Sequence, residues 1–257
     1  MKVFLPHVEV GITRRCMNLC AACNHLTPLE EAPFEMPAEV LREDLRRLGE
    51  VAEIGRLGML GGEPCLHPDI DRMLLLARAV NITRNVVLIT TGQLLERMTE
   101  RFWKTVPAIQ LHRYPGKLSD ERFKWIVERC ASERIALEVI QVQKFFPCLR
   151  KPSATETAEE AALRYKRCLM ARLCLLLDYG YLYGCPQSAV IPRLFMREHP
   201  GTVDGLPLDG ITPDKLLAFM TNTLPLKSCA RCSVNESTFD WRETTREKWV
   251  EDSTHAV

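Results

Sequence analysis

Three cysteines near the amino end are spaced to hold a metal cluster. Cys16, Cys20 and Cys23 form a C-x3-C-x2-C pattern directly after an apolar run. Ferredoxins supply four thiolates to each 4Fe–4S cluster, so three cysteines in one loop would leave one iron open to another ligand. Structural zinc takes four ligands, usually as two separated pairs, although His25 could provide a fourth here. The spacing favours a cluster with an open iron over zinc.

A second set of cysteines lies in the C-terminal third, with the spacing C-x16-C-x43-C-x2-C: Cys168, Cys185, Cys229 and Cys232. One C-x-x-C pair and two distant cysteines could hold a cluster or a structural zinc, or remain buried thiols. Cys148 and Cys174 are rival ligands, whereas Cys65 and Cys130 are interpreted as small apolar residues. Eleven cysteines in a cytosolic chain indicate metal binding rather than disulfides.

Short β-branched runs alternate with amphipathic stretches along the first half of the chain. The runs predict strands at Val8–Thr13, Leu57–Leu60, Val86–Thr90, Ala108–His112 and Ile135–Gln143. The stretches between them predict helices at Pro37–Ile54, Asp69–Val80, Gln93–Thr105 and Ser119–Ser132. Repeated strand–helix–strand units indicate an α/β fold with a parallel sheet, either open or closed into a full or partial barrel.

The pattern changes after about Phe145, where prolines and a Ser-Thr stretch resemble a linker. A helix over Thr155–Ala171 is predicted next, then a β-hairpin over Leu173–Tyr183 that turns at Gly180. A short helix capped by Thr212 precedes the C-x-x-C pair, and a polar, frayed tail is expected after about Trp249.

The composition excludes several classes of protein. With a net charge of +1 and a pI near 7.5, nothing calls for nucleic acid or an anionic membrane as a partner. The longest apolar run, Leu173–Leu177, is too short to span a bilayer, and Pro6 and His7 interrupt the start of a signal-peptide core. We expect a soluble cytoplasmic protein.

The cysteine loop after the first strand of an α/β chain resembles the radical S-adenosylmethionine (SAM) superfamily. That resemblance implies a partial (β/α)6 TIM-like barrel and a SAM molecule bound at the open iron. It also implies an electron donor of the flavodoxin or ferredoxin type. One position departs from the superfamily pattern: an aromatic residue often precedes the third cysteine, and here that residue is Ala22.

Two strand ends extend the resemblance. Gly61-Gly62-Glu63-Pro64, after the second strand, matches the GGEP motif, whose backbone carbonyls would accept hydrogen bonds from the SAM amino group. Glycines suit this place because no side chain blocks the approach. The third strand ends in Thr90-Thr91-Gly92, which resembles the superfamily's TNG ending, so Thr90 and Thr91 are candidate SAM contacts.

The second cysteine set resembles the twitch domain, the short form of the SPASM auxiliary-cluster module. That resemblance implies a second, fully ligated 4Fe–4S cluster on Cys168, Cys185, Cys229 and Cys232. It divides the chain into a radical SAM barrel (1–150), an auxiliary-cluster domain (151–245) and a polar tail (246–257). Chain length and cysteine spacing resemble the 2-deoxy-scyllo-inosamine dehydrogenases of aminoglycoside biosynthesis.

These resemblances imply an oxidoreductase of natural-product biosynthesis. SAM would be cleaved reductively to a 5′-deoxyadenosyl radical, which takes hydrogen from a small hydroxylated metabolite of the sugar or aminocyclitol type. The second cluster would accept the remaining electron, and a base would take the hydroxyl proton. Candidate catalytic or substrate-contacting residues at strand ends and near the second module are Glu9, His112, Tyr114 and Arg150.

Other functions remain open at this stage. Within radical SAM enzymes, a maturase of ribosomal peptides and a sugar epimerase or dehydratase are alternatives. From another class, the chain could be an electron carrier or a zinc-stabilised binding module. The Gly61–Pro64 motif argues against that class, because a carrier has no need of a SAM site.

Overall fold

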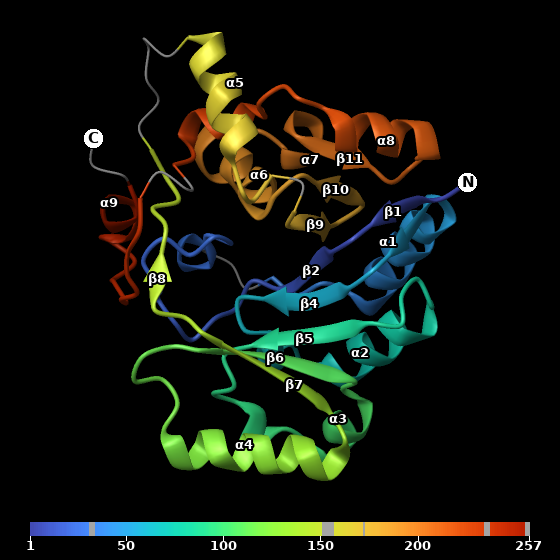
Figure 1. The fold of residues 1–257 in the computed structure, drawn as a ribbon, viewed down its shortest axis with the longest axis vertical. Coiled ribbons are helices and arrows are strands. Elements are labelled where there is room, and N and C mark those ends of the chain that lie inside the picture. Colours follow the sequence, from blue (N-terminus) through green and yellow to red (C-terminus); the bar gives the residue numbers. More distant parts are fainter. Residues whose placement is uncertain (31–33, 151–156, 172, 234–236, 255–257) are drawn as a thin grey trace.

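The computed structural model describes residues 1–30, 34–150, 157–171, 173–233 and 237–254. Its centre is one eight-stranded sheet in the order β11-β10-β9-β2-β4-β5-β6-β7 (Figure 1). The strand bounds are β2 Val8–Thr13, β4 Leu57–Gly61, β5 Val86–Thr90, β6 Ala108–Arg113, β7 Ala136–Gln141, β9 Leu175–Asp178, β10 Tyr181–Tyr183 and β11 Gly205–Pro207.

Most of this sheet is parallel. The run from β9 through β2, β4, β5 and β6 to β7 pairs in parallel, while β10 and β11 add antiparallel strands at one edge. The predicted α/β fold with a parallel sheet is therefore confirmed. The described strands form an open sheet with edges at β11 and β7, as in a partial barrel.

Helices follow the strands along the chain, and those that connect the parallel strands β2 to β7 cover one face of the sheet. Their bounds are α1 Ala38–Val51, α2 Ile70–Ala79, α3 Glu100–Thr105, α4 Asp120–Glu133, α5 Ala158–Arg167, α6 Pro186–Ile191, α7 Pro200–Val203, α8 Pro213–Thr221 and α9 Trp249–Ser253. Apolar side chains of α1 and α2, such as Leu45 and Met73, join fully buried strand residues such as Val10 and Leu88 in the main core.

Several predicted boundaries move. The last three residues of the helix expected over Pro37–Ile54 instead form strand β3 (Ala52–Ile54), which pairs with β1 (Val3–Leu5). The helix expected over Gln93–Thr105 is interrupted, because Thr99 caps a new helix by accepting from the backbone N–H of Phe102. The helix expected over Thr155–Ala171 spans only α5, and its first two predicted residues lie outside the described ones.

The main sheet crosses the boundary expected between residues 150 and 151. Strand β9 pairs in parallel with β2, so the first strand of the C-terminal part is also a strand of the barrel-like sheet. The predicted hairpin is present, with β9 antiparallel to β10 and Gly180 in its turn at a φ of 81°. The division into two domains remains a prediction.

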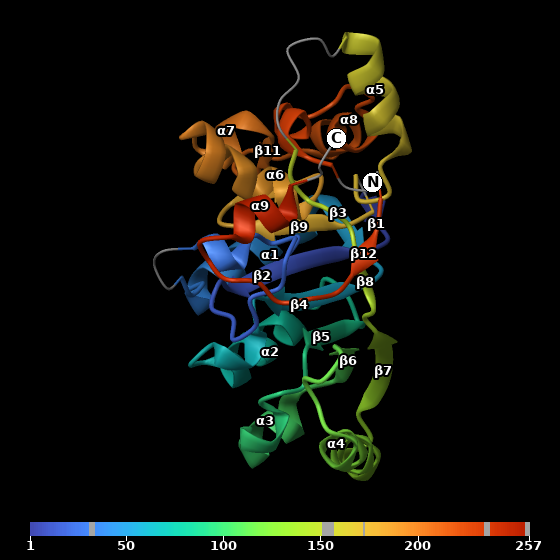
Figure 2. The ribbon, with the colours of Figure 1, turned by 90° about the vertical axis from the view of Figure 1, so that its left-hand side faces the viewer.

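The C-terminal tail is not frayed where the structure describes it. Trp249 is fully buried at the start of α9, and β12 (Phe239–Asp240) pairs with β8 (Lys144–Phe145). In Figures 1 and 2 this segment lies across the end of the sheet toward which the strand arrows point. Although most residues of the tail are polar, burial of the single Trp249 indole provides enough apolar contact to hold the segment in place.

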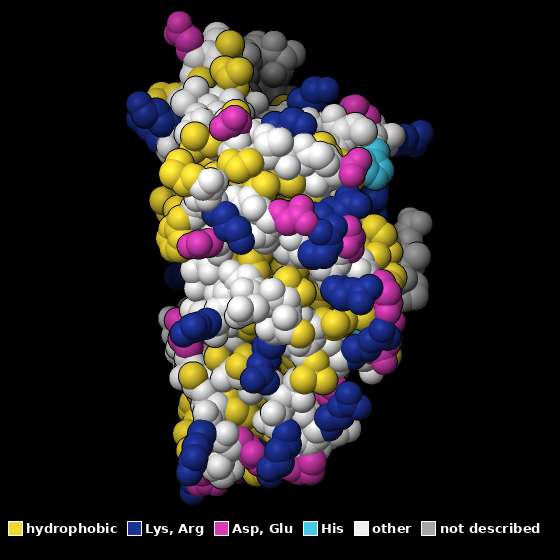
Figure 3. Space-filling model, turned by 90° about the vertical axis from the view of Figure 1, so that its right-hand side faces the viewer, with side chains coloured by type: hydrophobic (Ala, Val, Ile, Leu, Met, Phe, Trp, Pro, Cys, Tyr) yellow, Lys and Arg dark blue, Asp and Glu magenta, His cyan; other side chains and the backbone are white. Residues whose placement is uncertain are grey.

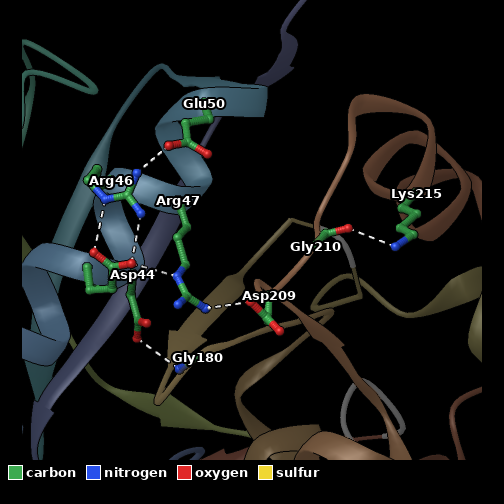
Figure 4. Close-up of polar contacts among 9 residues, drawn as sticks. Asp44, Arg46, Arg47, Glu50, Gly180, Asp209, Gly210 and Lys215 are labelled. Atoms are coloured by element: carbon green, nitrogen blue, oxygen red, sulfur yellow. Dashed lines mark hydrogen bonds and ion pairs between the residues drawn. The ribbon is translucent and has the colours of Figure 1, made fainter.

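Helix α1 is joined to the C-terminal part by a polar junction (Figure 4). The buried Asp44 carboxylate accepts a hydrogen bond of 2.9 Å from the backbone N–H of Gly180 in the β9–β10 turn. Nearby, Arg47 lies 3.4 Å from Asp209. Burial and the neighbouring Asp178 charge raise the pKa of Asp44 to about 6, although the Gly180 N–H favours the ionised form.

We expect Asp44→Asn to stabilise the protein at pH 7.5 and to do so less at pH 5, where only part of the penalty for ionising Asp44 is present. The pKa of Asp44 is raised on folding, so its stabilising contribution is present at low pH and is lost as the pH rises through about 6. The gain should be ~1 kcal/mol, a few degrees in thermal midpoint. Thermal unfolding at both pH values tests this, with the exposed Asp209→Asn as a control. A gain at pH 5 equal to that at pH 7.5 would contradict it.

The outer surface carries both signs of charge. On the face in Figure 3, Lys and Arg side chains are interspersed with Asp and Glu. Among the described residues, every helix is too short or too polar to cross a lipid bilayer.

Candidate cluster and cofactor site

The predicted cluster cysteines line one cavity of about 300 Å³ at the carboxyl ends of the strands. Cys16, Cys20 and Cys23 share its wall with Gly61, Gly62, Thr90 and Thr91. In parallel sheets, the carboxyl ends of neighbouring strands meet at one edge, which explains why these separate motifs converge. Burial raises the pKa of Cys16 and of Cys20 to about 12, so binding of metal must provide the energy that removes their protons.

The two glycines of the Gly61–Pro64 motif allow strand β4 to pack against the cysteine loop. A Cβ at Gly61 would lie 2.2 Å from the Thr13 carbonyl oxygen, and a Cβ at Gly62 would lie 2.2 Å from that of Arg15. The Gly62 N–H donates to Thr13 O over 2.9 Å. The glycines are thus required for backbone contact with the loop, a reason that the sequence interpretation did not contain.

Glu63 lies behind the cavity rather than in its wall. Its buried carboxylate accepts hydrogen bonds from the Thr90 hydroxyl (2.5 Å), the Thr91 hydroxyl (2.7 Å) and the Thr91 backbone N–H (2.9 Å). Its Oε1 also accepts from the Cys65 N–H over 3.2 Å. Glu63 therefore ties the ends of strands β4 and β5 together, and both threonine hydroxyls are already engaged as donors.

A hydrogen-bond chain leads from these threonines to the cysteine loop. The Gln93 amide nitrogen lies 3.2 Å from the Thr91 hydroxyl and donates over 3.0 Å to the Asn18 side-chain oxygen. Asn18 is buried within the C-x3-C-x2-C pattern and lines the same cavity. Neither Gln93 nor Asn18 was singled out from the sequence, because only the fold brings them together.

Three of the four candidate catalytic residues reach this cavity. Glu9, His112 and Tyr114 line it, together with His25. Arg150 is not among its lining residues; its backbone N–H donates to Arg231 O over 2.9 Å, beside the second cysteine set.

Among the described residues that line the cavity, Glu9 supplies the carboxylate. Burial alone would raise the pKa of Glu9, but the hydrogen bond with His7 (3.4 Å) holds it below its ordinary value. Burial lowers the pKa values of His25 and His112, which are therefore neutral at pH 7. The cavity thus presents one carboxylate together with two neutral imidazoles.

The four cysteines of the second set also meet. Cys168, Cys185, Cys229 and Cys232 line a small cavity of about 20 Å³. The Arg164 side chain fixes the C-x-x-C turn by donating to Cys229 O over 2.7 Å and to Cys232 O over 3.3 Å. Met170 lines both cavities, so the two cysteine sites share a wall. The rivals Cys148 and Cys174 line neither of them.

Both thiol sets are donor sets suited to iron–sulfur clusters. Three thiols with an open side fit a cubane that keeps one iron free, and four thiols fit a fully ligated one. In the described residues, no three Cys, His, Asp or Glu side chains converge on a single ion. A cubane does not require such convergence, because each thiolate binds a different iron.

Comparisons with known proteins identify the family of this chain. A model of the radical SAM superfamily matches residues 10–141, about half of the sequence, including the first cysteine loop and Gly61–Pro64. The GTP 3′,8-cyclase of Chlorobaculum tepidum is 28% identical over 98 residues. That match spans 37% of this chain and only 28% of the cyclase, so it does not carry over the cyclase's activity.

Two solved structures share the fold. BtrN in complex with AdoMet and 2-DOIA superposes with a TM-score of 0.51 at 13% identity, over 89% of this chain and 85% of BtrN. The protein anSMEcpe with bound AdoMet superposes with a TM-score of 0.56 at 13% identity, over 84% and 81%. At such identities these likenesses concern the fold alone. The superfamily model, in contrast, matches about half of the sequence, and this match shows that the chain belongs to the radical SAM superfamily.

Proposed function

We propose that this protein is a radical SAM oxidoreductase that oxidises a hydroxyl-bearing carbon of a small metabolite, of the sugar or aminocyclitol type. In this proposal Cys16, Cys20 and Cys23 hold the cluster that binds SAM. The set Cys168, Cys185, Cys229 and Cys232 holds a second cluster in an auxiliary domain of the twitch type. A flavodoxin- or ferredoxin-type protein supplies electrons. When bound, the first cluster supplies the electron that splits SAM into methionine and a 5′-deoxyadenosyl radical, and the second accepts an electron from the substrate.

The observation that carries the proposal is the joint placement of the two thiol sets and Glu9. The three-thiol site and Glu9 line one cavity, and the four-thiol site lies behind the shared wall at Met170. Across that wall, the Gln187 amide donates to the Asn24 side-chain oxygen over 3.3 Å, joining the neighbours of Cys185 and Cys23. A substrate in the cavity would thus lie next to SAM and near the proposed electron acceptor.

Glu9 is the side chain that we propose as base. Oxidation of an alcohol carbon after loss of a hydrogen atom also requires loss of the hydroxyl proton. The Glu9 carboxylate is ionised at neutral pH and is held in the cavity by β2, a central strand paired on both sides. The neutral imidazoles of His25 and His112 could accept or donate hydrogen bonds to further hydroxyl groups of the substrate.

The size of the cavity favours a small substrate. About 300 Å³ is at the lower end of the range for small-molecule sites, and SAM must also fit. Its lining also includes the apolar residues Val142, Phe145 and Phe146. These apolar side chains would exclude water from a reactive radical. This favours the metabolite oxidoreductase over the peptide maturase. The epimerase or dehydratase alternative differs in that its second cluster is not the terminal electron acceptor.

The test is substrate-dependent hydrogen transfer by wild type and Glu9→Gln. Reconstituted protein is incubated anaerobically with SAM, dithionite and a panel of deuterated polyols, amino sugars and aminocyclitols. We expect deuterium to enter 5′-deoxyadenosine and a ketone or aldehyde to form. Glu9→Gln should lower oxidation of the active compound by ~10²-fold or more, the usual effect of a general base, while SAM cleavage continues.

The matched control is Glu53→Gln, an exposed glutamate on edge strand β3, which should behave as wild type. A wild type that cleaves SAM but converts the active compound without net oxidation would support the epimerase or dehydratase instead. Full oxidation by Glu9→Gln would remove Glu9 from the mechanism.

A further inference from the structure

The C-terminal segment, residues 239–254, forms part of the wall around the first cysteine loop. It runs beside the loop like an added strand: Cys20 bridges to Glu243, the Ala21 N–H donates to Arg242 O (3.0 Å), and the Thr244 N–H donates to Leu19 O (2.9 Å). Its own start is fixed by the pairing of β12 with β8. A segment more than 200 residues away thus fixes the backbone between the second and third cysteines.

Two side chains of this segment complete the attachment. The Trp249 indole N–H donates to the Cys20 carbonyl oxygen over 2.8 Å, and its ring is fully buried. The Ser253 hydroxyl accepts from the Ala22 N–H over 2.8 Å. Ala22 and Trp249 belong to the same buried cluster, so the position where the superfamily often has an aromatic residue faces the C-terminal segment here.

A third side chain reaches a cluster thiol. The Trp241 indole N–H donates to Cys20 Sγ over 3.2 Å. The ring is held in place by Tyr114, at 5.2 Å between ring centroids, and by its own backbone N–H, which donates to Gln143 O over 2.8 Å. The other two thiols have longer contacts of 3.4 Å, Cys16 with the backbone N–H of Asn18 and Cys23 with the Thr27 hydroxyl.

An N–H group that points at a cluster ligand changes the energy of reduction. A reduced cluster carries one more negative charge, and part of it resides on the sulfur ligands, so a donor to sulfur stabilises the reduced state more than the oxidised one. Indole nitrogen can only donate, so this contact cannot reverse its direction.

On the basis of the proposed function, we propose that Trp241 raises the reduction potential of the cluster held by Cys16, Cys20 and Cys23. It acts as a positioning residue supplied by the C-terminal segment, through its hydrogen bond to Cys20 Sγ. A raised potential makes the cluster easier to reduce by a physiological donor protein.

The test compares Trp241→Phe with Trp249→Phe in the full-length, reconstituted protein. Both variants lose one indole from the same segment, but only the first loses a donor to sulfur. The midpoint potential is measured by redox titration followed by EPR, using the signal that changes when SAM is added to identify the first cluster. We expect Trp241→Phe to become harder to reduce by up to about tenfold in the ratio of reduced to oxidised cluster, or about 59 mV. Trp249→Phe should keep the wild-type potential.

A second measurement needs no variant to fold. Wild type carrying ¹⁵N-indole tryptophan should show a ¹⁵N coupling to the reduced first cluster in pulsed EPR. Absence of that coupling, or an unchanged potential in a fully loaded Trp241→Phe protein, would overturn the inference. An equal shift in both variants would also overturn it, because displacement of the whole C-terminal segment from the cysteine loop would then explain the change in potential. Failure of the proposed function would look different, as a wild type with no cluster that responds to SAM.

Discussion

Cys20→Ala is expected to abolish reductive cleavage of SAM. Three thiolates are the minimum that leaves one iron open while holding the cubane, so loss of one should release the first cluster or disorder it. Mutating a residue that only hydrogen-bonds to a metal ligand typically lowers metal affinity or activity by ~10–100-fold. Loss of a ligand itself should therefore lower 5′-deoxyadenosine formation by more than ~100-fold. The assay is anaerobic incubation with SAM and dithionite, with iron content measured on the same sample.

The control for this prediction is Cys130→Ala. Cys130 is a buried cysteine of α4 that packs in the main core and lines neither cavity. It should lose ~1–2 kcal/mol of stability from a small cavity but keep its iron and its SAM cleavage. Wild-type rates of SAM cleavage by Cys20→Ala would remove the three-cysteine loop from the proposed site.

Cys185→Ala should distinguish the roles of the two cysteine sets. We expect iron content to fall from about eight to about four atoms per chain, because only the second cluster is lost. Formation of 5′-deoxyadenosine should continue, whereas net oxidation of the substrate should stop for want of an electron acceptor. Iron and zinc analysis, with both products measured by mass spectrometry, tests all three statements.

Cys174→Ala is the matched comparison, because Cys174 lies nearby yet does not line the four-thiol cavity. It should keep about eight irons. Loss of iron from Cys174→Ala but not from Cys185→Ala would change the ligand assignment. A wild type that holds zinc in this site would instead support the structural zinc interpretation.

The local elements of the fold followed well from the sequence. Strands β2 and β5 have the predicted bounds, and the predicted caps Ser119 and Thr212 each accept a hydrogen bond from a backbone N–H at the start of their helix. Such features depend on a few adjacent residues, whose periodicity and side-chain chemistry are visible in the chain. The spacing of strands and helices did not distinguish an open sheet from a full or partial barrel, because repeated strand–helix–strand units are compatible with each.

Contacts between distant segments did not follow from the sequence. The pairing of β9 with β2 and the approach of Trp241 to Cys20 join parts of the chain more than 150 residues apart. A hydrophobic or polar pattern does not specify its partner, and a polar composition concealed the burial of Trp249. The position of Arg150 before the second cysteine set predicts a substrate contact, but Arg150 is not among the residues that line either cavity.

The sequence by itself determined which family the chain resembles and which residues are candidates for its chemistry, because the cysteines of one loop and the glycines at one strand end are close neighbours in the chain. It also determined the alternation of strands and helices that brings their carboxyl ends to one edge. Only the tertiary structure decided what surrounds those residues: the carboxylate of Glu63 behind the threonines, Glu9 in one cavity with two imidazoles, and an indole at Cys20. These arrangements arise from packing between remote segments, whose free energy depends on shape and burial rather than on neighbours in the chain.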